Sequence, residues 1–123
     1  MSRIPDFVAE TDALLHQEIP GVRLVNFGHL GDGNLHYNVQ APEGGDARAF
    51  LATEEERVNT LVYDAVGRFG GSISAEHGIG SLKAHTLEKH KSPVALSMMR
   101  AIKGALDPQN ILNPGRVLRP EAK

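Results

Sequence analysis

Two short clusters of the sequence combine imidazole and carboxylate side chains with glycine, which are the ingredients of a metal or acid–base site. The first cluster, residues 28–36, places His29 and His36 seven residues apart around a turn that contains Gly31 and Gly33. Neutral imidazole is the commonest side-chain ligand of transition metals, and glycine lets the backbone approach closely. If the flanking segments pair as strands, both rings can converge on one ion. Two histidines do not complete a site, so the spacing alone fits half a metal site and an ordinary turn-rich loop equally well.

The second cluster, residues 74–80, places Glu76 directly before His77. Successive side chains of an extended segment point in opposite directions, so we expect these two residues to have different roles. Beside His29 and His36, Glu76 would supply the missing oxygen ligand, and His77 would be a candidate general base. Taken alone, the dipeptide also fits a solvated pair in a surface loop.

Two other interpretations of the glycines and histidines are not favoured. Gly28, Gly31 and Gly33 do not form the pattern G-x-G-x-x-G, and a strand pattern rather than a helix follows them, which argues against a phosphate-binding loop. His85 and His90 lie five residues apart, a spacing that does not bring them onto one helix face, so we expect both at the surface.

The composition narrows the class of protein. A chain of 123 residues suits one compact domain, and 41% hydrophobic with 23% charged residues is ordinary for a globular protein. A formal net charge of -2 gives no field that attracts nucleic acid or anionic lipid, so neither is an expected partner. No apolar run approaches the roughly 20 residues that span a bilayer. Without cysteine, a disulfide framework, a thiolate metal site and a cysteine nucleophile are excluded. Redox chemistry therefore does not fix the compartment, and the cytoplasm is expected as the default.

The pattern of apolar residues predicts the elements that must hold the clusters. A helix is predicted over residues 4–18, with Pro5 in its first turn and a Pro-Gly stop at residues 20–21. Strand patterns over residues 22–27 and 34–40, joined by the glycine-bearing turn, predict a β-hairpin. The first cluster would therefore lie at the end of this hairpin.

The rest of the chain reads mainly as helix. A long helix is predicted over residues 47–69, with an apolar stripe of Phe50, Leu51, Val58, Leu61, Val62, Ala65 and Val66. A short extended piece over residues 72–75 leads into the second cluster, followed by helices near residues 86–90 and 93–106 and an irregular tail. This order predicts an α+β fold in which helices pack on one face of a small antiparallel sheet.

Three motifs together resemble a known family. After the two clusters, with Lys83 close behind the second, come L-D-P at residues 106–108 and I-L-N-P-G-R-V-L at residues 111–118. In this order they resemble the C-terminal domain of FAD-linked oxidases, within the vanillyl-alcohol oxidase superfamily. The resemblance covers residues 3–118 and is greatest to the D-2-hydroxyglutarate dehydrogenase, D-lactate dehydrogenase and glycolate oxidase subunit group. It implies a partial ferredoxin-like substrate (cap) domain of a flavoprotein oxidoreductase that converts a D-2-hydroxy acid into a 2-oxo acid.

The resemblance also implies roles for seven residues. The matching positions are the metal ligands His29, His36 and Glu76, the catalytic base His77, the substrate contact Asn34, and the cofactor-side residues Asn113 and Arg116. Two imidazoles and one carboxylate suit zinc, manganese or iron. A bound ion would orient the substrate, the base would remove its hydroxyl proton, and FAD would carry the redox step. Many family members have lysine where Arg116 stands, and a guanidinium fork is not equivalent to an ammonium group.

The same resemblance implies that other parts act with this one. Family members carry an N-terminal FAD-binding domain, so we expect residues 1–123 to be the C-terminal part of the substrate domain. We expect this fragment to be inert alone, with FAD bound mainly by the missing domain or subunit. An open sheet edge and an uncovered apolar patch favour a homo-oligomer. Two alternatives stay open: a stand-alone metal-dependent hydrolase with His77 as its base, and a non-catalytic self-associating module.

Overall fold

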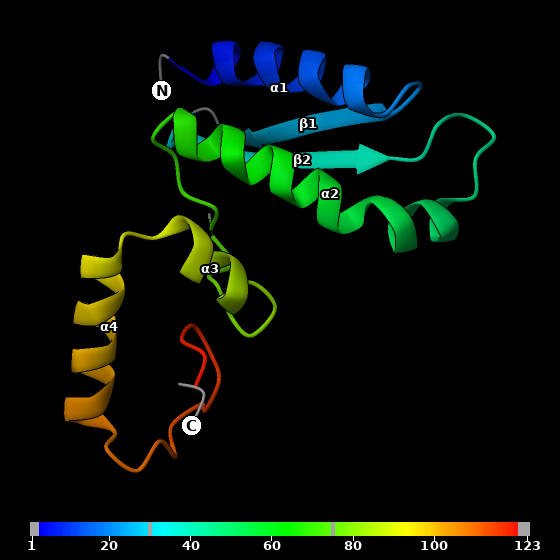
Figure 1. Cartoon of the computed structure of the whole chain (residues 1–123). Coiled ribbons are helices and arrows are strands. Elements are labelled where there is room, and N and C mark those ends of the chain that lie inside the picture. Colours follow the sequence, from blue (N-terminus) through cyan, green and yellow to red (C-terminus); the bar gives the residue numbers. More distant parts are fainter. Residues whose placement is uncertain (1–2, 30, 75, 121–123) are drawn as a thin grey trace. The chain divides into compact units, whose positions relative to one another are not determined.

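The computed structural model describes residues 3–29, 31–74 and 76–120, and the chain divides into two compact units, residues 1–75 and 76–123. The first unit contains α1 (Ile4–Glu18), β1 (Arg23–His29), β2 (Asn34–Gln40) and α2 (Ala47–Arg68), and the second contains α3 (Ala84–His90) and α4 (Pro93–Leu106) (Figure 1). Each unit is described by itself. The assignment of residues 1–123 to one part of a substrate domain stays a prediction.

The helices begin where local chemistry starts them. Helix α1 has proline in its first turn and occupies the predicted residues 4–18. Helix α2 begins after Asp46, whose Oδ1 accepts hydrogen bonds from the backbone N–H groups of Arg48 (2.8 Å) and Ala49 (3.2 Å). Such an N-cap satisfies donors that lack partners inside the helix. Helix α2 ends at Arg68, one residue before the predicted end.

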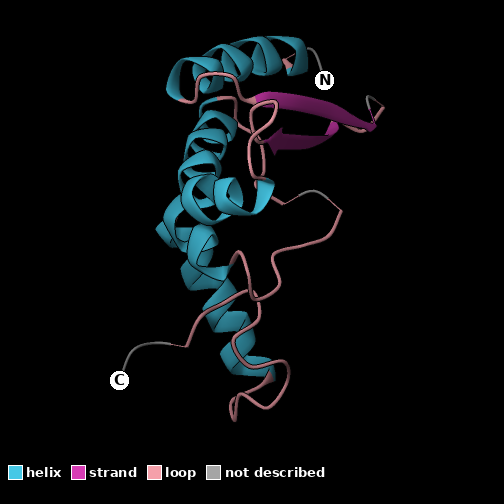
Figure 2. Cartoon of the chain, turned by 90° about the vertical axis from the view of Figure 1, so that its right-hand side faces the viewer, coloured by secondary structure: helices cyan, strands magenta, loops and turns pink. Residues whose placement is uncertain are grey.

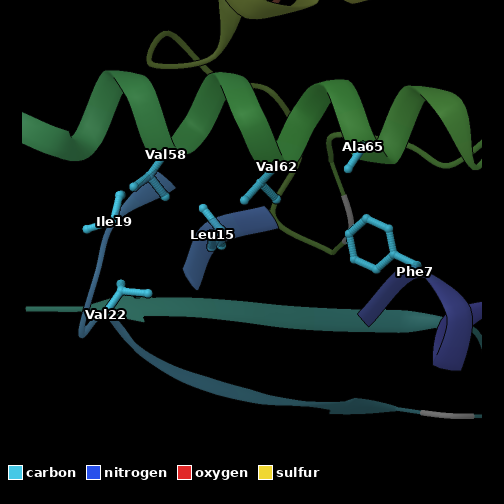
Figure 3. Close-up of a cluster of buried hydrophobic side chains, with 7 residues drawn as sticks. All are labelled: Phe7, Leu15, Ile19, Val22, Val58, Val62 and Ala65. Atoms are coloured by element: carbon cyan, nitrogen blue, oxygen red, sulfur yellow. The ribbon is translucent and has the colours of Figure 1, made fainter. Parts of the chain in front are cut away.

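A cluster of seven buried apolar side chains forms the core of the first unit. Figure 3 shows Val58, Val62 and Ala65 of α2 facing the side chains of α1, with the strands beyond. The remaining members are Phe7, Leu15, Ile19 and Val22. The predicted stripe of α2 is confirmed except at Leu51, which is 57% exposed. The buried positions of α2 begin at Val58, so the early turn that carries Leu51 lies outside the most buried part of the helix.

The two strands pair antiparallel in a hairpin that has one covered and one open face. The register pairs His29 with Asn34, Phe27 with His36, and Gly28 with Leu35. Alternate side chains on the covered face, Leu24, Leu35, Tyr37 and Val39, pack against the core formed with α1 and α2. This arrangement confirms the predicted α+β fold with helices on one face of a small antiparallel sheet.

Glycine at position 28 permits the close pairing of the strand ends. An added Cβ atom there would lie 2.1 Å from the carbonyl oxygen of Asn34 and 2.9 Å from the Cα of Leu35. The predicted turn over residues 28–33 was too long, because β1 runs two residues past Phe27 to His29. The strand ladder therefore carries His29 up to the turn on a regular backbone.

The segment before the second cluster is not a strand. Figure 2 shows loop rather than strand after α2, and residues 72–74 make no ladder within the described part of the chain. The Ser72 hydroxyl instead donates to the carbonyl oxygen of Ser74 (3.0 Å) and accepts from its N–H (3.3 Å). These local hydrogen bonds compete with strand pairing, so the predicted extended piece was wrong over residues 72–74, and residue 75 lies outside the described residues.

The second unit joins two helices to an irregular tail. The Ser92 Oγ accepts from the N–H of Ala95 (3.2 Å), and Pro93 follows as the first helical residue, so α4 begins as predicted. The helix ends before Asp107, as predicted, while α3 begins two residues earlier than expected. Among the described helices, none has the length and apolar character to cross a membrane.

Candidate functional site

The open face of the hairpin carries both histidines of the first cluster together with Asn34. Because side chains alternate along a strand, Phe27 and His29 of β1 share this face with Asn34 and His36 of β2. His29 and His36 are diagonal neighbours across the strand pair, a relationship in which Cα atoms are about 7–8 Å apart and long side chains can meet. The register therefore places both histidines on one face of the hairpin.

The ring of His36 is held by an aromatic neighbour. It stacks on Phe27, with ring centroids 4.9 Å apart and an angle of 8° between the planes. Phe27 is 58% exposed, which is unusual for a phenylalanine without a packing role. The stack restricts the rotamers of His36, which is partly exposed.

The turn adds a carboxylate that the sequence interpretation did not include. Ligand atoms of His29 and Asp32 lie within 4.8 Å of each other, close enough to share an ion. The Asp32 Oδ1 also accepts from the backbone N–H of Asn34 (3.1 Å), which fixes the carboxylate against the start of β2. The signal in the sequence was an aspartate three residues after a histidine inside a glycine-bearing turn.

Asn34 brings a polar group without a partner. Its Oδ1 is buried and makes no hydrogen bond among the described residues, although Asn34 as a residue is only partly buried. A buried oxygen without a donor is unfavourable by roughly 1–3 kcal/mol unless another molecule supplies one. The amide oxygen is therefore a candidate contact for a hydroxyl or amino group of a ligand.

A partly buried carboxylate anchors the hairpin from its covered face. The Asp12 Oδ1 accepts from the hydroxyl of Tyr37 and from the Nδ2 of Asn26 (3.2 Å). Burial, and then the hydrogen bond to Asp12, raise the pKa of the Tyr37 hydroxyl above its usual value. Asn26 and Tyr37 form one register pair, directly before the pair of Phe27 and His36. The anchor therefore fixes the strands immediately beside the candidate site.

The second cluster opens the second unit. Glu76 and His77 occupy a turn, and both are exposed. The predicted metal set of His29, His36 and Glu76 joins residues of both units and stays a prediction, as does the role of His77 as base. Of the two remaining histidines considered, His85 is exposed as expected, while His90 is partly buried.

The terminal motif meets the second cluster inside the second unit. The N–H of Val117 donates to the carbonyl oxygen of Gly80 (2.8 Å), and the Nη1 of Arg116 donates to the Oγ of Ser81 (2.8 Å). Asn113 is exposed, and its carbonyl oxygen accepts from the N–H of Arg116 (3.2 Å). Two motifs that lie more than thirty residues apart in the sequence therefore form one hydrogen-bonded region.

Comparison with known proteins shows the family to which the chain is similar. A family model described as "FAD linked oxidases, C-terminal domain" matches residues 1–117. A D-2-hydroxyglutarate dehydrogenase of Xanthomonas citri pv. viticola is 47% identical over 117 residues, 95% of this chain and 25% of that protein. The mitochondrial D-2-hydroxyglutarate dehydrogenase of Bos taurus is 40% identical over 96% of this chain and 20% of its own length. A D-lactate dehydrogenase of Archaeoglobus fulgidus is 43% identical over 80% of this chain and 21% of its own length.

The chain thus spans a quarter or less of the length of these relatives. The family model covers nearly all of the chain, including the hairpin cluster, the Glu-His turn and the terminal motif up to Val117. The chain therefore belongs to the FAD-linked oxidase family and corresponds to the C-terminal domain of its members.

Proposed function

We propose that this chain is the substrate- and metal-binding part of a FAD-dependent dehydrogenase that oxidises a D-2-hydroxy acid to a 2-oxo acid. Family membership supports the reaction class. The observation that carries the local assignment is the open hairpin face, where His29, Asn34 and His36 stand together beside Asp32. Such a grouping of nitrogen and oxygen donors on an exposed face has no role in packing the core.

The donor set fits a divalent transition metal. His29, His36 and Glu76 are the proposed ligands, and two imidazoles with a carboxylate suit zinc, manganese or iron. Asp32 supplies a further carboxylate within reach of His29. When bound, the ion would polarise the hydroxyl and carboxylate of the substrate. Stacking on Phe27 holds the His36 ring in place beforehand, which lowers the entropic cost of capturing the ion.

The remaining residues have roles that follow from their chemistry. His77 is the proposed base that takes the proton of the substrate hydroxyl. Asn34 offers its unpartnered Oδ1 to a polar group of the substrate. FAD, when bound, supplies the hydride acceptor, and Asn113 and Arg116 of the terminal motif are the proposed residues on its side. Within Arg116, the contact with Ser81 uses Nη1, so the guanidinium keeps other N–H groups for an acceptor on the cofactor.

The finer assignments belong to the same proposal. The relatives are named for D-2-hydroxyglutarate and D-lactate, so the substrate is proposed to be one of these acids or a near relative such as glycolate. The proposed partners are a FAD domain and further copies of this chain, since Val94, Met98 and Ile102 leave apolar surface exposed on α4. The isolated chain is proposed to be inert, and the proposed compartment is the cytoplasm.

Metal titration tests the proposal on the chain itself. Zinc or manganese is titrated by calorimetry into the wild type and into His29→Ala, His36→Ala and Glu76→Gln. We expect one equivalent of bound metal in the wild type and at least tenfold weaker binding in each variant, because each loses one donor. His85→Ala is the matched control, since it removes an exposed imidazole from the second unit. Equal affinity in the wild type and the three ligand variants would contradict the metal assignment.

A further inference from the structure

The chain after α4 follows a path that needs several unfavourable backbone conformations. Asn110 (φ 52°), Asn113 (φ 49°) and Val117 (φ 63°) all lie in the left-handed region. Asparagine tolerates this region, but a β-branched residue such as valine rarely adopts it. Strained residues persist only where surrounding contacts fix them, and they concentrate at functional sites. Hydrogen bonds at both ends of this segment hold it in that conformation.

At the start of the segment, one buried carboxylate closes a turn. Asp107 is only 6% exposed. Its Oδ1 accepts from the N–H of Ile111 (2.9 Å), and its Oδ2 accepts from the N–H of Leu112 (2.9 Å) and from the ammonium of Lys103. The same ammonium donates to the carbonyl oxygen of Leu112 (2.5 Å). Both oxygens are thus occupied, which satisfies the requirement that a buried charge be paired and hydrogen-bonded.

The electrostatics agree with this geometry. The hydrogen bond from Lys103 contributes most to holding the pKa of the Asp107 carboxyl below its ordinary value, and the N–H groups of Leu112 and Ile111 act in the same direction against the effect of burial. The carboxylate is therefore the form that the turn requires.

At its far end, the segment is attached to the second cluster. Arg116 bonds to Ser81, and Val117 bonds to Gly80, directly after the turn that carries Glu76 and His77. The chain between Asp107 and Val117 is thus fixed at two points, and Asn113 lies between them.

We propose that Asp107 is a positioning residue: by closing the turn at residues 107–112 it directs Arg116 and Val117 onto Gly80 and Ser81, and so orders the loop of the second cluster. This inference rests on the proposed function for the roles of His77, Asn113 and Arg116. It goes beyond that function in assigning the order of the loop to a residue that touches neither metal, substrate nor flavin.

Amide hydrogen exchange, followed by NMR on the whole chain without metal or flavin, tests the inference. In Asp107→Asn, we expect the amides of Ile111, Leu112 and Val117 to exchange at least tenfold faster, while amides inside α4 keep their wild-type rates. Glu54→Gln is the control, because Glu54 pairs with Arg57 (3.5 Å) in the first unit and its loss removes an equal charge. This control should leave the rate at Val117 unchanged.

Two outcomes would overturn the inference. Faster exchange at Ile111 and Leu112 with no change at Val117 would make the turn a local feature, and equal acceleration throughout α4 would make Asp107 a general stabiliser. If Asp107→Asn does not fold, Lys103→Met replaces it, because this variant leaves both N–H contacts of Asp107 available. The same amides must then exchange faster than in the wild type, by a smaller factor. The exchange experiment contains no metal or flavin, so its result does not depend on the metal assignment. A failed metal titration would contradict the proposed function, and a failed exchange result would contradict the role of Asp107.

Discussion

Different interactions stabilise the interior of each of the two units. The first has a continuous cluster of seven buried apolar residues between two helices and a hairpin. In the second, the described buried residues are few, namely Ala84, Thr86, Leu87, Leu96 and Asp107. The second unit depends instead on hydrogen bonds and ion pairs around Asp107, Glu88 and Arg116.

The same difference applies to the candidate site residues that each unit carries. The first unit presents its candidate ligands from paired strands that a packed core supports. The second presents Glu76 and His77 from a turn whose order depends on polar contacts with the terminal segment. Apolar packing responds little to pH and salt, whereas ion pairs respond to pH and, where they are exposed, to salt. The two units should therefore lose their structure under different conditions.

The largest expected effect is on the first unit. Leu15→Ala removes a side chain that is fully buried, so the free energy of unfolding of this unit should fall by roughly 2–5 kcal/mol. Urea unfolding followed by tyrosine fluorescence measures it selectively, because Tyr37 and Tyr63 both lie in the first unit. Leu51→Ala, at a 57% exposed position, is the control and should change stability by no more than about 0.5 kcal/mol.

A smaller effect is expected where the strands approach most closely. Gly28→Ala places a Cβ atom 2.1 Å from the carbonyl oxygen of Asn34, so the strand ends must separate, at a cost of about 1–3 kcal/mol. The same shift should weaken zinc binding through His29. Gly31→Ala adds a methyl group with nothing within 4 Å and provides the comparison in urea unfolding and calorimetry. Wild-type stability and affinity in Gly28→Ala would show that the close pairing is dispensable.

The smallest effect is a pH response confined to the second unit. The pKa of Asp107 is lowered in the folded state, so its stabilising contribution is complete above the ordinary aspartate pKa of about 3.9 and is lost as pH falls through the lower folded value. Protection of the Ile111 and Leu112 amides, corrected for intrinsic exchange, should therefore decrease in acid before the core of the first unit opens. Asp107→Asn should abolish this dependence, and an unchanged pH profile in that variant would assign it to another group.

Local signals were sufficient for most of the fold. The bounds of α1 and α4 could be predicted because proline stands in each first turn, and because Pro20 and Pro108 follow their ends. The hairpin followed from alternation around a glycine-bearing turn. Leu51 was misassigned because periodicity gives the face of a helix but not how far along that face the core extends.

The candidate site was less predictable, because its geometry depends on contacts between distant residues. Sequence placed His29 and His36 near one another through the hairpin alone. The proximity of Asp32 to His29 depends on the conformation of the turn, and the bond from Val117 to Gly80 joins segments whose spacing carries no periodic signal. Likewise, no pattern marks Asp107 as an acceptor for Ile111 and Leu112, since the required turn contains a left-handed asparagine.

The alternation of side chains along the hairpin places the residues that determine the fold on one face and the candidate site residues on the other. Leu24, Leu35, Tyr37 and Val39 fix the register through the core, and a slip of β2 by one residue would turn His36 inward and expose its three apolar residues. The core thus determines which side chains face outward without constraining what those side chains are. The outward positions behave as an interchangeable surface, so ligand sets or substrate contacts at positions such as 25 and 38 could diversify in evolution, or be redesigned, while the inward set preserves the fold.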